Sequence, residues 1–402
     1  MRTREQLDKQ GLTPDMVRFL REIVAIPSPS GGEGAVLERI AAEMAKTGWE
    51  EIHYDGIGNL LGKIGSGEHA LAIDAHADTV GPGAIADWGC DPYQGLERDG
   101  WVWGRGTVDQ KGGVVAAVYA GRLIGEQGLP ADCTLHLVIS IQEENCEGLC
   151  WDHLIVKEKF RPEGVILTEP TGLTIKRGQL GHLEMAVTAA GRSAHAFCPE
   201  KGENAIYRMT PLIGRIREIA PRLHSHPAFG RGRISITDIR SGSPSGNSVP
   251  DTCRILIDRR FCPQETEENL RDEIRALFDD AHFEITVPIY RELSHRGALL
   301  EGRKFFPGWV TDEESPLVGS ARETLTLIGG GNTGCRHLGV QHQRGEHDGE
   351  ARHFHDRLRT GKRGTGPSAR RAGPDRASAD GLFFLCPAPE RILPPLIFPS
   401  GK

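Results

Sequence analysis

The sequence predicts an α/β protein, in which a smaller α+β sandwich is inserted into a larger α/β domain with a mixed, mostly parallel sheet. Short apolar runs alternate with amphipathic helical patterns as far as about residue 170. From about residue 178, strands with period-two alternation take over. The length of 402 residues also exceeds what a single hydrophobic core usually holds.

The elements of the larger domain follow in chain order. Helical spacing of apolar residues predicts helices at 14–25, which Pro27 ends, and at 33–47. Further patterns predict strands at 51–54, 58–64 and 71–74, a helix at 113–126, and buried strands at 135–141 and 164–168. Apolar strands between amphipathic helices are typical of a sheet covered on both faces.

The inserted domain begins with the alternating run 181–190, which predicts a half-exposed antiparallel strand. The patterns that follow predict a helix at 203–220, strands at 233–239 and 252–261, and a helix at 264–279. This β-α-β-β-α order indicates a small sandwich. We therefore expect the larger domain at 1–177 and 291–328, the inserted domain at 178–290, and a separate tail at 329–402.

The tail at 329–402 differs in composition from the rest. It holds 12 Lys and Arg against 7 Asp and Glu, which gives the tail a net charge of +5. Because the whole chain has a net charge of −7, residues 1–328 have a net charge of −12. Neither helical nor strand periodicity is visible from 329 to 380. This composition predicts a disordered or non-native segment.

Overall composition excludes several function classes. A net charge of −7 argues against a general nucleic-acid or anionic-membrane binder. We find neither a run of about 20 apolar residues, as a membrane span needs, nor the apolar region of a signal peptide. Nine cysteines without CxxC pairs favour reduced thiols, and hence a cytoplasmic protein.

Histidine and acidic residues follow the predicted strands. In Asp74-Ala-His76-Ala-Asp78, the histidine can bind a metal through one ring nitrogen while the acid holds the other. Asp109 lies in the glycine-rich run 104–113, directly before a helix. That glycine spacing matches neither GxGxxG nor GxxxxGK[ST], so a phosphate loop is disfavoured.

Two further acidic clusters follow later strands. Glu143 and Glu144 come directly after the strand 135–141, and Glu169 follows 164–168. Adjacent carboxylates at the end of an apolar strand are costly unless a positive group compensates them. One can ligate a metal while the other acts as a base. Taken singly, each cluster also fits a solvated loop.

The four clusters together predict a metal centre. Each closes or follows an element of the same α/β domain, and open α/β sheets bind ligands at their strand ends. One histidine with several carboxylates suits a pair of divalent cations, Zn²⁺ first, with Mn²⁺ or Co²⁺ as alternatives.

With these motifs in this order, residues 14–328 resemble the two-metal amidohydrolases and exopeptidases that include acetylornithine deacetylase, succinyl-diaminopimelate desuccinylase, aminoacylase and glutamate carboxypeptidase. The run from Gln142 to Trp151 is most similar to a branch linked to selenium metabolism. The resemblance implies a metal-dependent hydrolase that cleaves an amide, by deacylating an N-acyl amino acid or by hydrolysing a dipeptide.

The resemblance also implies which residues hold the metal ions. His76 and Glu169 are expected on one ion and Glu144 on the other, with Asp109 bridging both. Two such ions lie about 3.5–4 Å apart and share a hydroxide, which attacks the amide carbonyl.

Further roles are implied for four residues. Glu143 is the expected general base and later acid, and Asp78 is expected to orient the metal-binding histidine. The inserted domain matches the family's lid and dimerisation domain. There His195 would reach the partner subunit's site to stabilise the oxyanion, and Asn247 would help to hold the substrate. On residue type alone, these two are equally a surface histidine and a turn residue.

The tail departs from the family, because such enzymes need one more histidine for the second metal, in an Ala-His-x-Pro-Asp-Glu-like stretch after a Ser/Thr-x-Asn-Gly loop. Neither motif occurs, and the tail histidines stand in other contexts: His337, His342, His347, His353 and His355. A reading-frame shift between about 328 and 338 explains this. Codons read one base later permit Trp-Val-Phe-Ser-Thr-Asn-Gly over 338–344 and Ala-Leu-Ala-His-Arg-Pro-Asp-Glu over 364–371.

Alternatives stay open at this point. Without the last ligand, the chain could be a catalytically impaired or non-enzymatic binding protein on the same fold, unless a tail histidine replaces that ligand. A cysteine hydrolase using Cys146 or Cys150 is disfavoured, because no Cys-His-Asn set is evident. Arg259 and Arg260 could hold a substrate carboxylate, but exposed strand charges are the expectation.

Overall fold

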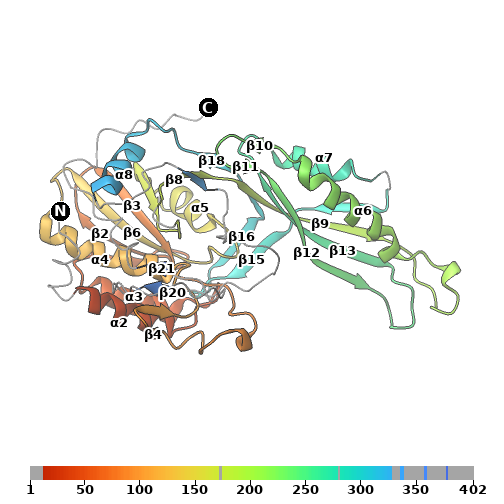
Figure 1. Cartoon of the computed structure of the whole chain (residues 1–402), viewed down its shortest axis with the longest axis horizontal. Helices are drawn as coiled ribbons and strands as arrows, with labels where there is room; N and C mark the ends of the chain where they lie inside the picture. The colour runs from red at the N-terminus through yellow and green to blue at the C-terminus, as the bar shows by residue number, and fades with distance from the viewer. Residues whose placement is uncertain are drawn as a thin grey trace.

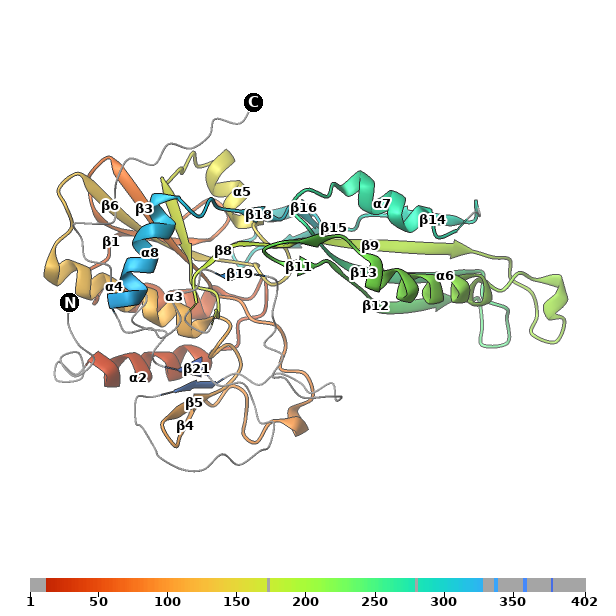
Figure 2. The same ribbon diagram turned by 45° about the horizontal axis from the view of Figure 1, so that its top comes forward.

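The computed structural model describes residues 12–171, 174–278 and 281–327, together with three short strands at 336–338, 357–359 and 377–378. Figure 1 shows a rounded body from which an elongated arm extends. Figure 2 shows the same arm from a second direction, with β9 running along its length. The body contains the larger domain, and the arm is the inserted domain.

The body is built on a five-stranded mixed sheet in the order β1-β2-β6-β3-β7. Its strands are β1 (Glu50–Tyr54), β2 (Leu60–Gly65), β3 (His69–His76), β6 (Cys133–Ser140) and β7 (Gly164–Leu167). The β6, β3 and β7 strands are mutually parallel, whereas β1 and β2 pair antiparallel. The carboxyl ends of three neighbouring strands therefore meet at one edge.

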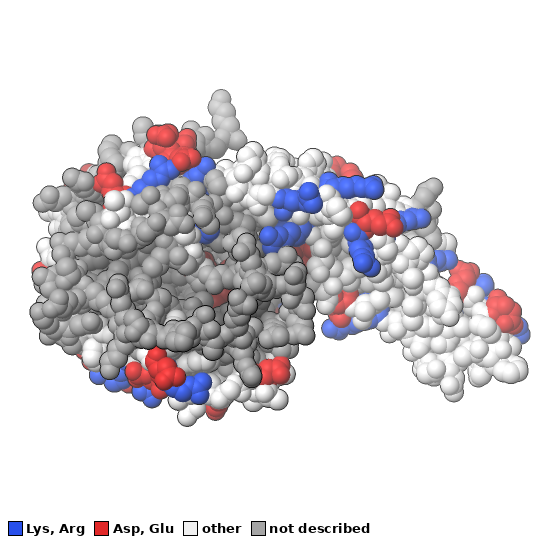
Figure 3. All heavy atoms as spheres, viewed as in Figure 1, with Lys and Arg blue, Asp and Glu red and all other residues white. Residues whose placement is uncertain are grey.

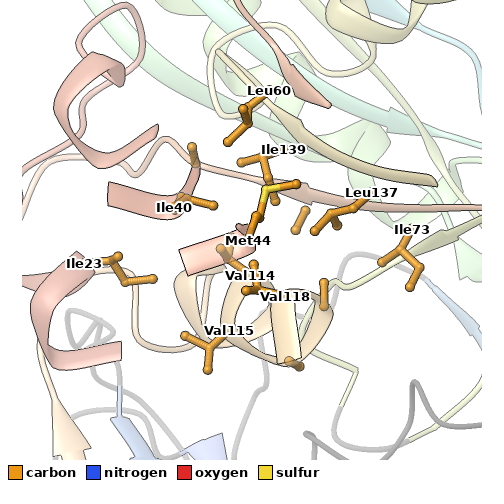
Figure 4. Close-up of a cluster of buried hydrophobic side chains, with 14 of the residues drawn as sticks. Ile23, Ile40, Met44, Leu60, Ile73, Val114, Val115, Val118, Leu137 and Ile139 are labelled. Atoms are coloured by element: carbon orange, nitrogen blue, oxygen red, sulfur yellow. The ribbon is translucent and has the colours of Figure 1, made fainter. Parts of the chain in front are cut away.

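Apolar helix faces cover one side of this sheet. The helices α2 (Leu12–Val24), α3 (Gly34–Met44) and α4 (Lys111–Gln127) contact one another. Figure 4 shows side chains of α3 and α4 beside those of β2, β3 and β6. In α2 the buried residues recur every three or four positions, as the helical period requires. In a separate hydrophobic cluster, Leu154 of α5 (Leu149–Val156) packs with Leu61 and Val138.

The arm contains a second hydrophobic core. Its antiparallel sheet has the order β12-β13-β9-β14, and the short β17 adds to β9. The helices α6 and α7 pack on the face that carries the odd-numbered residues of β9. The element bounds are β9 (Gly181–Ala190), β12 (Arg233–Gly242), β13 (Thr252–Phe261), β14 (Phe283–Thr286), β17 (Phe305–Phe306), α6 (Ala205–Ile219) and α7 (Glu267–Arg275).

The remaining elements connect or border these two units. They are β4 (Leu96–Arg98), β5 (Trp101–Trp103), β8 (Lys176–Gln179), β10 (Ser225–His226), β11 (Gly230–Arg231), β15 (Ile289–Leu293), β16 (Leu299–Arg303), β18 (Trp309–Val310), α8 (Pro316–Leu327), β19 (Arg336–Leu338), β20 (Arg357–Arg359) and β21 (Ala377–Ser378). Basic and acidic side chains are interspersed along the face of the arm seen in Figure 3. In the described part of the chain, no helix combines the length and apolarity that crossing a bilayer needs.

The predicted fold class is confirmed, with an α/β body on a mixed sheet and an α+β insertion. One expectation about the arm was wrong. Arg259 is not an exposed strand charge, since it is fully buried and pairs with Glu265 at 3.0 Å and Glu273 at 2.9 Å. Most of the tail at 329–402 lies outside the described residues, so its predicted disorder stays a prediction.

Candidate metal centre

Strand register brings the predicted residues to one edge of the sheet. His76 at the end of β3 is the partner of Ser140 at the end of β6, and Asp74 is the partner of Leu167 at the end of β7. The segments that follow β6 and β7, with Glu143, Glu144 and Glu169, therefore start beside the end of β3. Asp109, two residues before the start of α4, joins them there.

His76 lies at the centre of the cluster and is 1% exposed. Its Nδ1 lies 2.9 Å from the main-chain oxygen of Asp78. Because a carbonyl oxygen can only accept a hydrogen bond, Nδ1 carries the proton. In the neutral ring, Nε2 then carries no proton, and its lone pair can bind a cation.

Three carboxylates surround that Nε2 atom. It lies 3.0 Å from Asp109 Oδ1, 3.8 Å from Glu143 Oε2 and 3.9 Å from Glu169 Oε1. Ligand atoms of His76, Asp109 and Glu144 all lie within 4.8 Å of one another. The structure therefore brings all five predicted residues into one cluster.

The segment that carries Glu143 and Glu144 is fixed by its backbone. The carboxylate of Asp78 accepts hydrogen bonds from the N–H groups of Glu143 at 3.1 Å and Glu144 at 3.2 Å. Glu33 accepts one from the N–H of Gln142 at 3.0 Å. The Asp78 carboxylate also lies 3.6 Å from Nδ1 of the histidine ring, so this residue contacts both sides of the cluster.

Burial and mutual repulsion change the acidity of the cluster. Desolvation raises the pKa of Glu143 to about 8 and that of Glu144 to about 7, and the charge of Asp109 adds to both. Desolvation likewise raises the pKa of Glu169 well above its usual value. Burial alone would lower the pKa of His76, but the hydrogen bond with Asp109 and the surrounding carboxylates raise it well above 6.5.

These shifts describe a site that lacks positive charge. Without a cation, several acids must hold protons, and the imidazole nitrogen faces acceptors. A divalent cation would remove both costs. One imidazole nitrogen with several carboxylate oxygens is a donor set that Zn²⁺, Mn²⁺ and Co²⁺ accept, so the residues present fit such an ion.

Two predicted residues lie elsewhere. His195 follows the end of β9 and Asn247 precedes the start of β13, and these two strand termini are paired through Ala190 and Thr252. In Figure 1 this end of the two strands is the one farther from the body. There His195 pairs with Ser248, and the Ala196 N–H donates to the Asn247 carbonyl at 2.7 Å. The structure thus joins these two residues to each other but not to the carboxylate cluster of the same chain.

Other residues of the site escaped the sequence analysis. Gln110 donates to Glu169 at 2.5 Å, and its side-chain oxygen accepts from the His76 N–H at 3.2 Å and from Thr168 at 2.7 Å. Ser30 donates to Asp78 at 2.6 Å. A polar residue directly after a motif acid was the only available signal for Gln110, and Ser30 lies 48 positions from its partner.

Comparison with known proteins matches the inserted domain to a family model and most of the chain to curated relatives. A family model described as the peptidase dimerisation domain matches residues 177–286. The uncharacterized protein YgeY of Escherichia coli (strain K12) is 43% identical over 302 residues, which cover 75% of each chain. Succinyl-diaminopimelate desuccinylase of Paracoccus denitrificans is 29% identical over 280 residues, covering 65% of this chain and 72% of its own.

Solved structures share the fold. The dipeptidase Dug1p of Saccharomyces cerevisiae gives a TM-score of 0.62 at 15% identity, over 83% of this chain and 86% of its own. The Bacillus subtilis YXEP protein, a dinuclear metal-binding peptidase of the M20 family, gives 0.54 at 13% identity over 84% of each chain. The resemblance drawn from the motifs is therefore confirmed: the chain belongs to the M20 peptidase family of metal-dependent hydrolases that act on peptide and amide bonds.

Proposed function

We propose that the chain hydrolyses the amide bond of a small N-acyl amino acid or a dipeptide, with two divalent cations, Zn²⁺ first, and Glu143 as general base. The observation that carries this proposal is the ring of carboxylates around Nε2 of His76, whose other nitrogen is already used by a carbonyl. Such a cluster is costly without a cation and is suited to holding one.

The proposed ligands are those that the family resemblance implies, and their closeness in the cluster supports the proposal. His76 and Glu169 would hold one ion, Glu144 the other, and Asp109 both. When bound, such ions lower the pKa of a water molecule and polarise the amide carbonyl. Gln110 would keep Glu169 in place through its short hydrogen bond, and Asp78 would orient the imidazole through its carbonyl.

Glu143 is placed to move the proton. Its Oε2 lies 3.8 Å from Nε2 of His76, and its backbone N–H donates to the Asp78 carboxylate. As the water oxygen adds to the carbonyl carbon, Glu143 takes a proton from it. When the C–N bond breaks, Glu143 gives that proton to the departing amine.

His195 cannot serve the cluster of its own chain. The ten-residue strand β9 separates the base of the arm from its end, a span of about 33 Å. We therefore infer a homodimer in which His195, with Asn247 beside it, reaches the partner's site. The Phe197 N–H donates to His195 Nδ1 at 3.1 Å, which leaves the proton on Nε2, where it can be donated to an oxyanion.

Free thiols at buried positions of the described chain, such as those of Cys133, Cys146 and Cys150, support a cytoplasmic location. Their chemistry does not support a cysteine hydrolase. Burial raises the pKa of Cys146 to about 11 and that of Cys150 well above its usual value, so neither thiol is an activated nucleophile.

The test is a screen of the metal-loaded chain against N-acetyl amino acids and dipeptides, with Glu143→Gln as the matched variant. We expect turnover in the wild type, and a loss of about 1,000-fold or more in kcat for Glu143→Gln at unchanged metal content. Near-normal kcat in the metal-bound variant would show that another group is the base.

A second function rests on the tail. Without the family's C-terminal histidine, the chain would be an impaired enzyme or a binding protein on the same fold. We propose that a reading-frame shift between about 328 and 338 is the cause of the missing histidine motif. Metal content separates the two functions, since about two ions per chain favours the enzyme. Resequencing the gene decides the frame: an unambiguous frame that encodes the printed tail would end this proposal.

A further inference from the structure

The segment after β6 is attached to the arm as well as to the body. Within this segment, residues 142–148, the main-chain oxygen of Asn145 accepts a hydrogen bond from Lys304 Nζ. Lys304 follows β16 and also binds Glu184 of β9 at 3.0 Å. Its side chain is 15% exposed, so this bridge is largely shielded from water. The catalytic segment is therefore tied to the central strand of the inserted domain.

A second tie lies two residues further along the same segment. Glu147 Oε1 lies 2.8 Å from His182 Nδ1 and 3.5 Å from Arg260 Nη1. His182 Nε2 lies 3.1 Å from Asp258 Oδ2, and Arg260 donates to both oxygens of Asp258. One carboxylate from the body and one from the arm thus share a histidine and an arginine.

These charged residues occupy one face of the arm. His182 is the cross-strand partner of Arg260, and Glu184 is that of Asp258. All four lie on the even-numbered face of β9 and β13, opposite the face that α6 and α7 cover. They stand at the end of the sheet nearest the body. The apolar core of the arm therefore does not need them. His182 and Arg260 instead pair with Glu147 of the segment 142–148, and Glu184 pairs with Lys304.

The charges balance across the two ties. The cluster holds three carboxylates, from Glu147, Asp258 and Glu184, and two permanent cations, from Arg260 and Lys304. A protonated His182 makes the total neutral. This agrees with the pKa of His182, which burial lowers but Asp258 and Glu147 raise further, to a net value above its usual one.

From these contacts we propose that Lys304 and Glu147 are positioning residues, which make the placement of Glu143 and Glu144 depend on the orientation of the inserted domain. The proposal rests on the proposed function, in which Glu143 is the base. The body alone fixes the start of the segment, through Glu33 and Asp78. The arm fixes the part after Glu144, through Asn145 and Glu147.

Two measurements test this, and one is independent of activity. Hydrogen exchange of peptides from 141–149 reports on the N–H bonds to Asp78. We expect exchange there to be about tenfold faster in Lys304→Met and in Glu147→Gln than in the wild type, with β6 peptides unchanged. The matched control is Arg303→Met. Arg303 is the positively charged residue next to Lys304 in the chain, but it pairs with Glu267 of the arm.

The second measurement is steady-state kinetics on the metal-loaded protein. We expect Lys304→Met and Glu147→Gln to lower kcat about tenfold or more, with KM within about twofold and metal content unchanged. Lys304→Arg should restore most of kcat, and Arg303→Met should leave it unaltered. A merely structural loss would lower metal content and kcat together.

Either of two results would overturn the proposal. One is unchanged exchange over 141–149 in both variants, which would mean that the arm does not hold the segment. The other is faster exchange with normal kcat, which would mean that the contacts of Lys304 and Glu147 do not affect the catalytic placement of Glu143. If the wild type hydrolyses nothing, the proposed function fails, while the exchange data still decide whether the arm anchors the segment.

Discussion

Metal binding should release protons, and the structure sets how many. In the metal-free chain the pKa of Glu143 is about 8 and that of Glu144 about 7. At pH 7 these groups hold about 0.9 and about 0.5 of a proton, hence about 1.4 together. At pH 9 the same two groups hold only about 0.1. A divalent cation that ionises both should therefore displace about 1.3 more protons at pH 7 than at pH 9.

Isothermal titration of Zn²⁺ into the metal-free chain measures this number directly. The apparent enthalpy is recorded in several buffers with different ionisation enthalpies, and its slope gives the protons released per ion bound. His76 and Glu169 can add to the total at both pH values. A slope near zero at pH 7, or the same slope at both pH values, would refute the argument that burial keeps these acids protonated.

Three further predictions concern stability. In EDTA, the urea midpoint should fall as pH rises from about 5 to 8, because Glu143 and Glu144 have pKa values raised above the usual 4.5 and the folded chain binds more protons than the unfolded one; a higher midpoint at pH 8 would contradict this. Leu137→Ala, which removes a fully buried side chain of β6, should cost about 2–5 kcal/mol by urea denaturation, whereas the exposed Leu299→Ala should cost under about 0.5 kcal/mol; equal costs would argue against this core. Arg259→Met should cost about 3–5 kcal/mol, since it leaves two carboxylates without their buried partner, and a neutral result would show that the arginine is solvated.

The sequence was informative wherever chemistry follows a strand. Apolar runs predict buried strands, parallel strands align their carboxyl ends, and an acid after each end needs a compensating charge. That reasoning brought His76, Asp109, Glu143, Glu144 and Glu169 into one hypothesis, and the structure places them together.

Residues whose partners are far away in the chain were not predictable in this way. Glu33 binds the backbone of a residue 109 positions away, and Lys304 binds one 159 positions away. Arg259 continues the buried alternation of β13, but an arginine on an apolar strand face is rarely buried unless paired. Its partners, Glu265 and Glu273, lie 6 and 14 positions later in the chain, after the end of β13.

Short elements gave little signal for a physical reason. The helix α5 has eight residues, about two turns, and its apolar residues do not form a single clear stripe. The strands β15 and β16 form a separate two-stranded hairpin with most side chains exposed, so no core imposes alternation on them. Tertiary contacts rather than local pattern define such elements.

Anomalous diffraction from crystals soaked in Zn²⁺, recorded on either side of the zinc absorption edge, tests the metal centre most directly. We predict a peak about 2.0–2.1 Å from His76 Nε2, with a carboxylate oxygen of Asp109 in its coordination shell and a second peak on the side of Glu144. Zinc bound only at other positions, with the His76 cluster left empty, would contradict the assignment of this site and the hydrolytic mechanism built on it.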